Sequence, residues 1–272
     1  MSKATVWDRA SAVTRAGLGA RLTSPFTVRA LSVMIGVAAW EVYGRAIRSV
    51  IFTYPTAIAR AFAQLVRAGE LWFYLRSSLV VLSLGLLLAI VVGIPLGILV
   101  GRRRLVEYVV DPYINALYAT PLVAVIPVIV LWLGFQTTAK VVLVFLFCVF
   151  PILINTYQGV KSIDPRLVEV TRAFCSSERD LWRDLMLPSS MPFILAGIRL
   201  AIGRGLVGMV VAEFYTTITG LGYMIVQYAN TFRMDRLFVP IVLLMAMGII
   251  LTSILRSFER RLAPWLYIAR DE

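Results

Sequence analysis

The side chains that could carry covalent chemistry are few in this chain. Its 272 residues include no histidine and two cysteines, Cys148 in an apolar run and Cys175 in a charged stretch. The lack of histidine excludes Ser-His-Asp and Cys-His catalysis, histidine metal sites and histidine proton relays, and the cysteines have no metal-ligand spacing. The sequence also lacks the G-x-x-x-x-G-K-[ST] loop that cradles phosphates. We therefore expect that this chain is not an enzyme and does not bind ATP through such a loop.

Charged side chains instead gather in residues 169–188, with the sequence EVTRAFCSSERDLWRDLMLP. This stretch lies between two long apolar runs and holds three arginines and four acidic residues. A helix that lies on anionic lipid headgroups usually has a clearly basic polar face. The slightly acidic balance here favours a protein partner over a membrane surface.

Capping signals divide this region into two short helices. Asp164 suits the N-cap of the first helix and Pro165 its first position. The apolar face of that helix would hold Leu167, Val170 or Thr171, and Phe174. After a break at residues 175–177, Ser177 and Asp180 form the pattern of a capping box. The apolar stripe of the second helix consists of Leu181, Trp182, Leu185 and Met186. Pro188 is expected to end the second helix.

The composition is that of a membrane protein. Hydrophobic residues make up 60% and charged residues 15% of the chain, and the mean hydropathy is +0.83. Soluble domains are about 45–50% apolar and about 25% charged. A spanning helix needs about 20 mostly apolar residues, and the segments that qualify are 29–48, 78–100, 113–133, 138–158, 193–215 and 237–256. The third of these contains Pro121 and Pro127, and we expect it to be kinked or broken there.

The basic residues indicate how these spans are oriented. The net charge is +12, and Lys and Arg concentrate in the N-terminal tail, in the loops after the second and fourth spans, and at the C-terminus. Such residues accumulate in cytoplasmic loops, so both termini are expected in the cytoplasm. We find no groove pattern of aromatic and basic residues for nucleic acid. The tail at residues 1–28 does not have the layout of a signal peptide and is expected to be retained.

Two segments would lie on the outer side. Residues 49–77 are expected to form an amphipathic helix at the interface, and Gly220 and Gly222 permit a tight bend within residues 216–236.

Small residues recur at helical spacing in two spans. Gly93, Gly97 and Gly101 share one face, and Gly197, Ala201 and Gly205 share another. Small residues let helices approach closely in lipid. These faces could serve ordinary packing in the bundle, line a homodimer seam or move during transport, and the sequence leaves these interpretations open.

Charges within or near spans are costly in lipid and are functional candidates. They are Glu41, Arg45, Arg199, Arg204 and Glu213. We expect Arg199 and Arg204 near the cytoplasmic start of the fifth span, where they can reach the interface. Glu213 could pair with an arginine, hold a loop or face a substrate path.

The charged stretch resembles the EAA motif of permease subunits from ATP-binding-cassette (ABC) importers. Glu169, Val170 and Thr171 stand at the Glu-Ala-Ala positions, Cys175 stands at the glycine position, and Leu187-Pro188 closes the motif. A glycine there would suit a turn with φ > 0, and a residue with a Cβ costs about 1–2 kcal/mol in that conformation. The turn is therefore either strained or of another shape in this chain.

The resemblance extends over roughly residues 50–262. The segments SSLVVLSLGLLLAIVVGIPLGILVG, TPLVAVIPVIVLWLG, FPILINTYQGV and TGLGYMI are similar to the type I branch that imports nitrate, taurine, alkanesulfonates and similar small solutes. The resemblance implies an all-α integral membrane protein with six transmembrane helices and both termini cytoplasmic. It divides the chain into a tail (1–28), a first span with an outer amphipathic segment (29–74), a permease core (75–258) with a coupling loop (165–188), and a C-terminal tail (259–272).

The resemblance also implies partners. The coupling loop would dock on a cytoplasmic ABC ATPase dimer, which binds ATP and Mg²⁺ while this chain holds no cofactor. The residues assigned to coupling are Glu169, Arg172, Ala173, Phe174, Cys175, Ser176, Ser177, Leu181, Trp182, Leu185 and Pro188. An extracytoplasmic binding protein would deliver the substrate, and a second permease, in a homodimer, would complete the path across the bacterial inner membrane.

Two alternatives stay open at this point. An ion-gradient-driven secondary transporter would use intramembrane acids such as Glu41 and Glu213. The substrate could also be an uncharged vitamin precursor or a pyrimidine-like compound.

Overall fold

The chain is helical in every regular element of residues 25–47, 49, 51–216 and 218–262, which the computed structural model describes. The elements are α2 (Pro25–Ile47), α3 (Pro55–Arg67), α4 (Glu70–Arg102), α5 (Arg104–Ala119), α6 (Leu122–Leu133), α7 (Thr137–Lys161), α8 (Pro165–Ala173), α9 (Glu178–Asp180), the π-helical turn η1 (Leu181–Met186), α10 (Leu187–Thr216), α11 (Leu221–Asn230) and α12 (Met234–Leu262). The expected all-α class is confirmed. The predicted tails fall largely outside the described residues.

Five helices are long and apolar enough to cross a membrane, and each covers one predicted span. The remaining predicted span, 113–133, is divided between α5 and α6, which meet at an angle of 93°. The break follows from Pro121, because a proline disfavours the helical conformation in the residue before it. Thr120 accordingly has an extended backbone with ψ of 130°. The predicted break is thus confirmed at Pro121, whereas α6 continues through Pro127.

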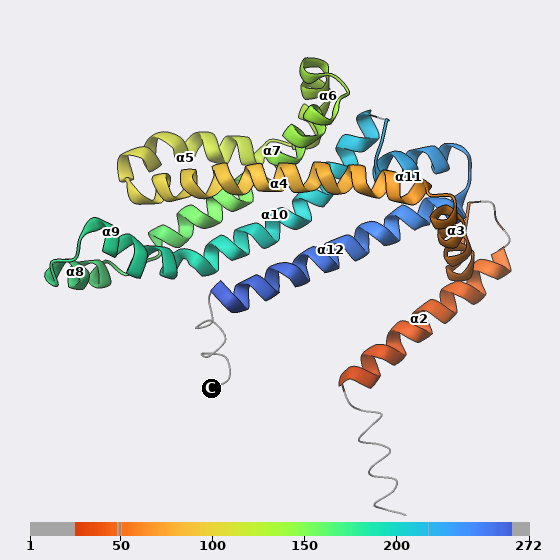
Figure 1. Ribbon diagram of the computed structural model, residues 1–272, viewed down its shortest axis with the longest axis horizontal. Helices are drawn as coiled ribbons and strands as arrows, with labels where there is room; N and C mark the ends of the chain where they lie inside the picture. The colour runs from red at the N-terminus through yellow and green to blue at the C-terminus, as the bar shows by residue number, and fades with distance from the viewer. Residues whose placement is uncertain (1–24, 48, 50, 217, 263–272) are drawn as a thin grey trace, which may run out of the picture.

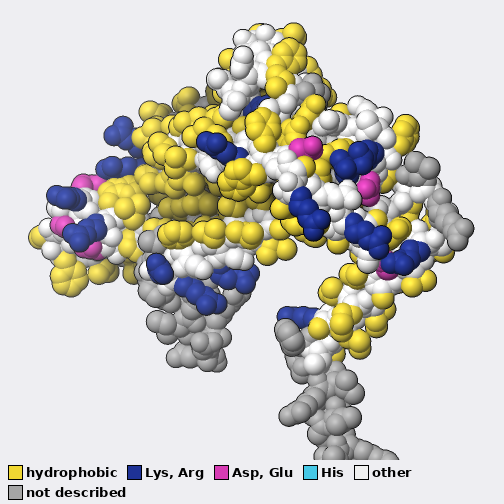
Figure 2. All heavy atoms as spheres, turned by 45° about the vertical axis from the view of Figure 1, so that its right-hand side comes forward, with side chains coloured by type: hydrophobic (Ala, Val, Ile, Leu, Met, Phe, Trp, Pro, Cys, Tyr) yellow, Lys and Arg dark blue, Asp and Glu magenta, His cyan; other side chains and the backbone are white. Residues whose placement is uncertain are grey.

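The core of the bundle is built on α7, which packs along both α4 and α10 (Figure 1). The largest cluster of buried side chains includes Val81 from α4, Cys148 and Ile152 from α7, Met209 from α10 and Met247 from α12. Many large apolar side chains are exposed, and they cover much of the face seen in Figure 2. A surface of this kind suits a lipid environment, because lipid tails are as apolar as these side chains and their exposure to lipid has no hydrophobic cost.

The small-residue faces of α4 and α10 both pack against α7 within this chain. A Cβ added to Gly97 would lie 2.7 Å from the Leu153 carbonyl oxygen, and one added to Gly197 would lie 3.0 Å from the Pro151 carbonyl oxygen. A Cβ added to Gly205 would lie 2.7 Å from the Cys148 Sγ. Of the three interpretations, which are packing in the bundle, a homodimer seam and a moving face, the structure supports packing within this chain.

The predicted end of the second short helix at Pro188 is wrong. Residues Glu178–Thr216 form one continuous helical run of 39 residues through η1 and α10. A proline removes one N–H donor and its ring crowds the carbonyl one turn earlier. The π-helical turn before Pro188 relieves this crowding, since the Leu187 N–H donates to the Trp182 carbonyl five residues back.

α2 stands apart from the other long helices. Only 6% of its most apolar 18-residue stretch is buried within this chain, and the helix diverges from the bundle in Figure 1. The expected outer amphipathic helix is α3, which buries Ile58, Ala61 and Leu65. This face packs against α12 and α4, so α3 belongs to the bundle rather than lying free on the membrane surface.

Candidate functional site

The charged segment, residues 165–188, lies at one end of the bundle (Figure 1). Asp164 caps α8 as predicted, because its Oδ1 accepts the Arg166 N–H at 2.9 Å. The predicted capping box of α9 is also present. The Asp180 N–H donates to the Ser177 Oγ at 3.2 Å, and the Ser177 N–H donates to the Asp180 Oδ2 at 3.3 Å.

The turn between these helices is left-handed at Cys175, where φ is 55°. The Cys175 N–H donates to the Arg172 carbonyl at 2.9 Å, and the Ser176 N–H reaches back to the Thr171 carbonyl at 3.4 Å. This is the conformation that a glycine would adopt without cost. The turn therefore keeps the shape of a glycine turn although a side chain with a Cβ occupies it.

One of the two apolar stripes of this segment is largely covered, and the other is exposed. Leu181 in the second stripe is buried, with 5% of its surface exposed, and Trp182 and Leu185 are half-buried. In the first stripe, Phe174 is 81% exposed and Leu167 and Val170 are about half exposed. We expected the stripe at Leu181, Trp182 and Leu185 to be offered to a partner. That expectation is wrong for Leu181, because its side chain is already buried within this chain.

Arg102, at the end of α4, holds the segment against the bundle. Its guanidinium lies 2.8 Å from the Glu178 carboxylate and 5.3 Å from the centre of the Trp182 ring. Both groups of the ion pair are well exposed, so the pair contributes at most about 1 kcal/mol. From the sequence, Arg102 is one of the basic residues that mark a cytoplasmic loop, and nothing in the local pattern links it to Glu178 or Trp182 about 80 positions later.

The other residues assigned to coupling lie on the surface of the same segment. Glu169, Arg172, Ala173, Cys175 and Ser177 are exposed, and Ser176 and Pro188 are partly covered. The structure thus brings the predicted coupling residues together in one compact helix pair, with Leu181 as their internal support.

Glu213 is fully buried near the C-terminal end of α10. Its carboxylate accepts hydrogen bonds from the Ser78 hydroxyl at 2.6 Å and from the Gly222 N–H at 2.7 Å. Lys140, also buried, donates to the Thr219 carbonyl at 2.8 Å. These contacts assign Glu213 to holding the loop around Gly220, one of the three roles considered, and give it no exposed surface on a substrate path. Lys140 and Ser78 were missed, because only the tertiary fold brings them to this loop.

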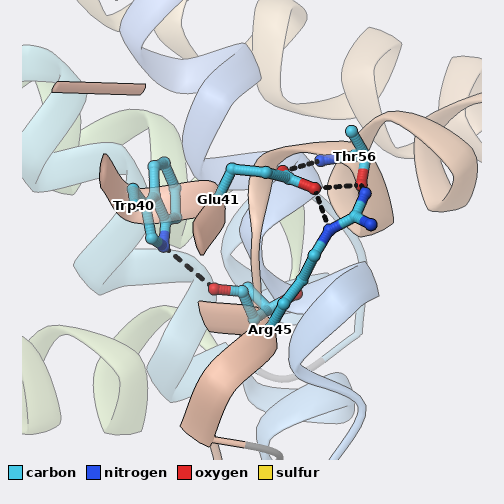
Figure 3. A network of polar contacts seen from close by, with 5 residues as sticks. Trp40, Glu41, Arg45 and Thr56 are labelled. Atoms are coloured by element: carbon cyan, nitrogen blue, oxygen red, sulfur yellow. Dashed lines mark hydrogen bonds and ion pairs between the residues drawn. The ribbon is translucent and has the colours of Figure 1, made fainter. Parts of the chain in front are cut away.

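Glu41 and Arg45 fasten α2 to the start of α3 (Figure 3). The Glu41 carboxylate accepts from the Arg45 Nε at 2.6 Å, from the Thr56 hydroxyl at 2.7 Å and from the Thr56 N–H at 3.0 Å. The Trp40 Nε1 also donates to the Thr53 carbonyl at 2.9 Å. A carboxylate is favourable at a helix N-terminus, so these charges have a structural role at the α2–α3 junction.

The two arginines of α10 have different surroundings. Arg199 forms an ion pair with Glu259 of α12 and so ties the two helices together. Arg204 donates to the Tyr118 hydroxyl at 2.6 Å, with its guanidinium 4.7 Å from the centre of that ring. At 1.5 Å per residue, Arg204 lies about 25 Å from Leu187 and about 18 Å from Thr216. Its expected position near the cytoplasmic start of the fifth span stays a prediction.

Comparisons with known proteins agree with this architecture. Residues 93–264 match the family described as binding-protein-dependent transport system inner membrane component. The chain is 33% identical over 231 residues to the putative aliphatic sulfonates transport permease protein SsuC of Bacillus subtilis, covering 84% of each chain. It is 32% identical over 227 residues to the formylaminopyrimidine transport permease protein ThiX of Halalkalibacterium halodurans, covering 83% of this chain and 90% of the relative.

The fold is also that of a solved transporter. An amino acid ABC transporter crystallised with histidines aligns with a TM-score of 0.50 and 19% identity, covering 74% of this chain and 98% of that chain. The family match spans more than half of the sequence, and the resemblance to the sulfonate and taurine branch is confirmed. This multi-pass membrane protein belongs to the family of binding-protein-dependent ABC transport permeases.

Proposed function

We propose that this chain is the permease subunit of an ATP-driven importer for a small sulfonate, taurine, nitrate or similar solute. In this proposal the segment 165–188 docks on a separate cytoplasmic ATPase that binds ATP and Mg²⁺. Both termini lie in the cytoplasm of a bacterium, and the spans cross its inner membrane. A second copy of the chain completes the path, and an extracytoplasmic binding protein delivers the solute.

The exposed face of α8 carries this proposal. Leu167, Val170 and Phe174 present apolar surface at the end of the bundle, in a segment whose charges nearly balance. Isolated exposed apolar residues are common, but a contiguous apolar face rimmed by charge marks an interaction site. An apolar helix face of this kind suits a groove on a protein partner.

The segment is also built to transmit motion. Leu181 anchors it internally, and η1 joins it to α10 without a flexible linker. A displacement of α8 and α9 by a partner would therefore move α10, which packs along α7 in the middle of the bundle.

The test uses two exposed phenylalanines. Phe174→Ser removes the centre of the proposed docking face, and Phe232→Ser removes an exposed phenylalanine between α11 and α12. The complex is purified through a tag on the permease, and retained ATPase and ATP-dependent solute uptake in proteoliposomes are measured. We expect Phe174→Ser to lose ATPase and uptake while Phe232→Ser retains the ATPase. Wild-type retention and uptake in Phe174→Ser would refute the docking role, and uptake without ATP would point to a secondary transporter.

A further inference from the structure

The position of Arg204 is unusual for a charged residue. It lies near mid-length of α10, opposite the middle of α7, and within the described residues no carboxylate lies within 4.0 Å of it. Charge within a membrane span is costly and marks substrate or ion pathways when it is retained. Arg199, five residues earlier, forms an ion pair with Glu259. Arg204 is therefore the arginine of α10 that has no carboxylate partner among the described residues.

The Tyr118 hydroxyl accepts only one of the hydrogen bonds that the Arg204 guanidinium can donate. A guanidinium has five N–H donors in a fixed fork, and the Tyr118 hydroxyl accepts from one of its nitrogens. The ring of Tyr118 lies against the same group and holds it in place. The remaining donors have no protein acceptor among the described residues and can bind an anion in the two-pronged manner of an arginine.

A pocket of about 290 Å³ lies beside this arginine. It opens where the span made of α5 and α6 is broken, and Tyr118 and Thr120 line it on that side. Leu122, at the start of α6, adds to the lining beside the break, and Phe147 and Phe150 of α7 contribute apolar surface. In membrane transporters, broken helices near the middle of the bilayer are common places for substrate sites.

The pocket combines one cation with aromatic and aliphatic walls. We propose that it is a subsite for a short aliphatic sulfonate, with the sulfonate on Arg204 and the alkyl chain along Phe147 and Phe150. An uncharged pyrimidine would give the guanidinium no anionic partner, and nitrate has no apolar group to contact the Phe147 and Phe150 rings. The volume lies at the lower end of the range of about 300–1,000 Å³ for ligand pockets, which suits a small solute.

This inference deepens the proposed function and rests on it. An acidic lipid headgroup offers the same anionic chemistry as a sulfonate, because the pocket is open to the protomer surface. The experiment must therefore separate a transported solute from a bound lipid.

Binding and uptake of ³⁵S-labelled butane-1-sulfonate test the inference. The complex of permease and ATPase is placed in phosphatidylcholine nanodiscs for binding and in proteoliposomes, with the binding protein, for uptake. We expect Arg204→Gln to weaken binding and uptake by about tenfold or more, as for the loss of a charged partner, with retained ATPase unchanged. Arg204→Lys should recover part of the lost binding and uptake, because lysine restores the positive charge but lacks the paired N–H donors of a guanidinium. Arg60→Gln, an exposed arginine of α3, removes the same charge elsewhere and should match the wild type.

The apolar wall has a test of its own. Phe147→Leu should raise the KM for butane-1-sulfonate more than the KM for methanesulfonate, because only the longer compound reaches the ring. A structural effect of the substitution would change both compounds equally, and that result would overturn the placement of the alkyl chain.

The outcomes separate the two proposals. No ATP-dependent uptake of any sulfonate by the wild type would refute the proposed substrate class. Wild-type uptake that persists in Arg204→Gln would overturn the subsite and leave the importer intact. If phosphatidylglycerol co-purifies with the wild type and is lost in Arg204→Gln, while sulfonate binding is unchanged, the pocket is a lipid site and the inference is wrong.

Discussion

The Ser78 hydroxyl donates a 2.6 Å hydrogen bond to the Glu213 carboxylate, although 135 positions separate the two residues. The same hydroxyl oxygen accepts the Leu221 N–H at 2.8 Å. Together with the bond from the Gly222 N–H to Glu213, these contacts join α4, α10 and α11 at one buried point. Gly220 fits beside the carboxylate with φ of 114°, where a side chain would overlap it.

Glu213→Gln should destabilise the protein. An amide has one acceptor oxygen, so it can accept from only one of the two present donors, the Ser78 hydroxyl and the Gly222 N–H, and the other donor loses its acceptor. An unsatisfied buried group costs about 1–3 kcal/mol, so the unfolding temperature in detergent should fall. Glu70→Gln, at the exposed start of α4, is the matched control and should change it little. An unchanged unfolding temperature in Glu213→Gln would remove the structural role assigned to this carboxylate.

Gly97→Ala should also destabilise the bundle, because the new methyl would lie 2.7 Å from both the Leu153 carbonyl oxygen and the Thr156 Cβ. Overpacking of this kind costs about 1–3 kcal/mol. Gly36→Ala in α2 has no atom within 4 Å of the new methyl and should be neutral or slightly stabilising, since alanine favours helices. Thermal unfolding of both variants checks the prediction. Equal stability of the two would mean that α4 and α7 do not pack as closely as described.

Cys175→Gly should be tolerated or stabilising. The native φ of 55° is unfavourable for a residue with a Cβ by about 1–2 kcal/mol, and glycine removes this strain at some cost in the entropy of the unfolded chain. Cys175→Val places a β-branched residue in the same conformation and should reduce stability. Unfolding temperature and retention of the ATPase are the measurements. A clear loss of folding or of ATPase in Cys175→Gly would show that the thiol itself supports the turn.

Glu41→Gln should loosen the junction between α2 and α3. The carboxylate accepts three hydrogen bonds from Arg45 and Thr56, and the amide would lose the charge and one acceptor. Hydrogen exchange at the Thr56 N–H, followed by mass spectrometry of peptides from the start of α3, should become faster. Exchange in α7 serves as the internal control and should stay the same. Unchanged exchange at Thr56 would indicate that other contacts hold α2 in place.

The class of protein, the long helices and the local caps can be predicted from the amino-acid sequence alone. Apolar runs of spanning length located the long helices, since a bilayer demands continuous apolar segments whose backbone bonds are satisfied internally. The caps at Asp164 and Ser177 and the break at Pro121 were predictable, because each depends on residues within a few positions of one another. The resemblance of residues 169–188 to a known motif then identified the family.

Which side chains contact one another across the bundle depends on how the helices pack in three dimensions. The stripe at Leu181 and the stripe at Phe174 are both amphipathic in sequence, yet in the folded chain Leu181 is buried and Phe174 is exposed. Glu213 and Arg204 are both charges within one helix, yet one meets Ser78 and Gly222 inside the protomer and the other meets Tyr118 at an open pocket. Apolar periodicity and capping residues can be recognised within a few neighbouring positions of the sequence. The residue that pairs with a charge can lie more than 80 positions away, because the fold brings the two together.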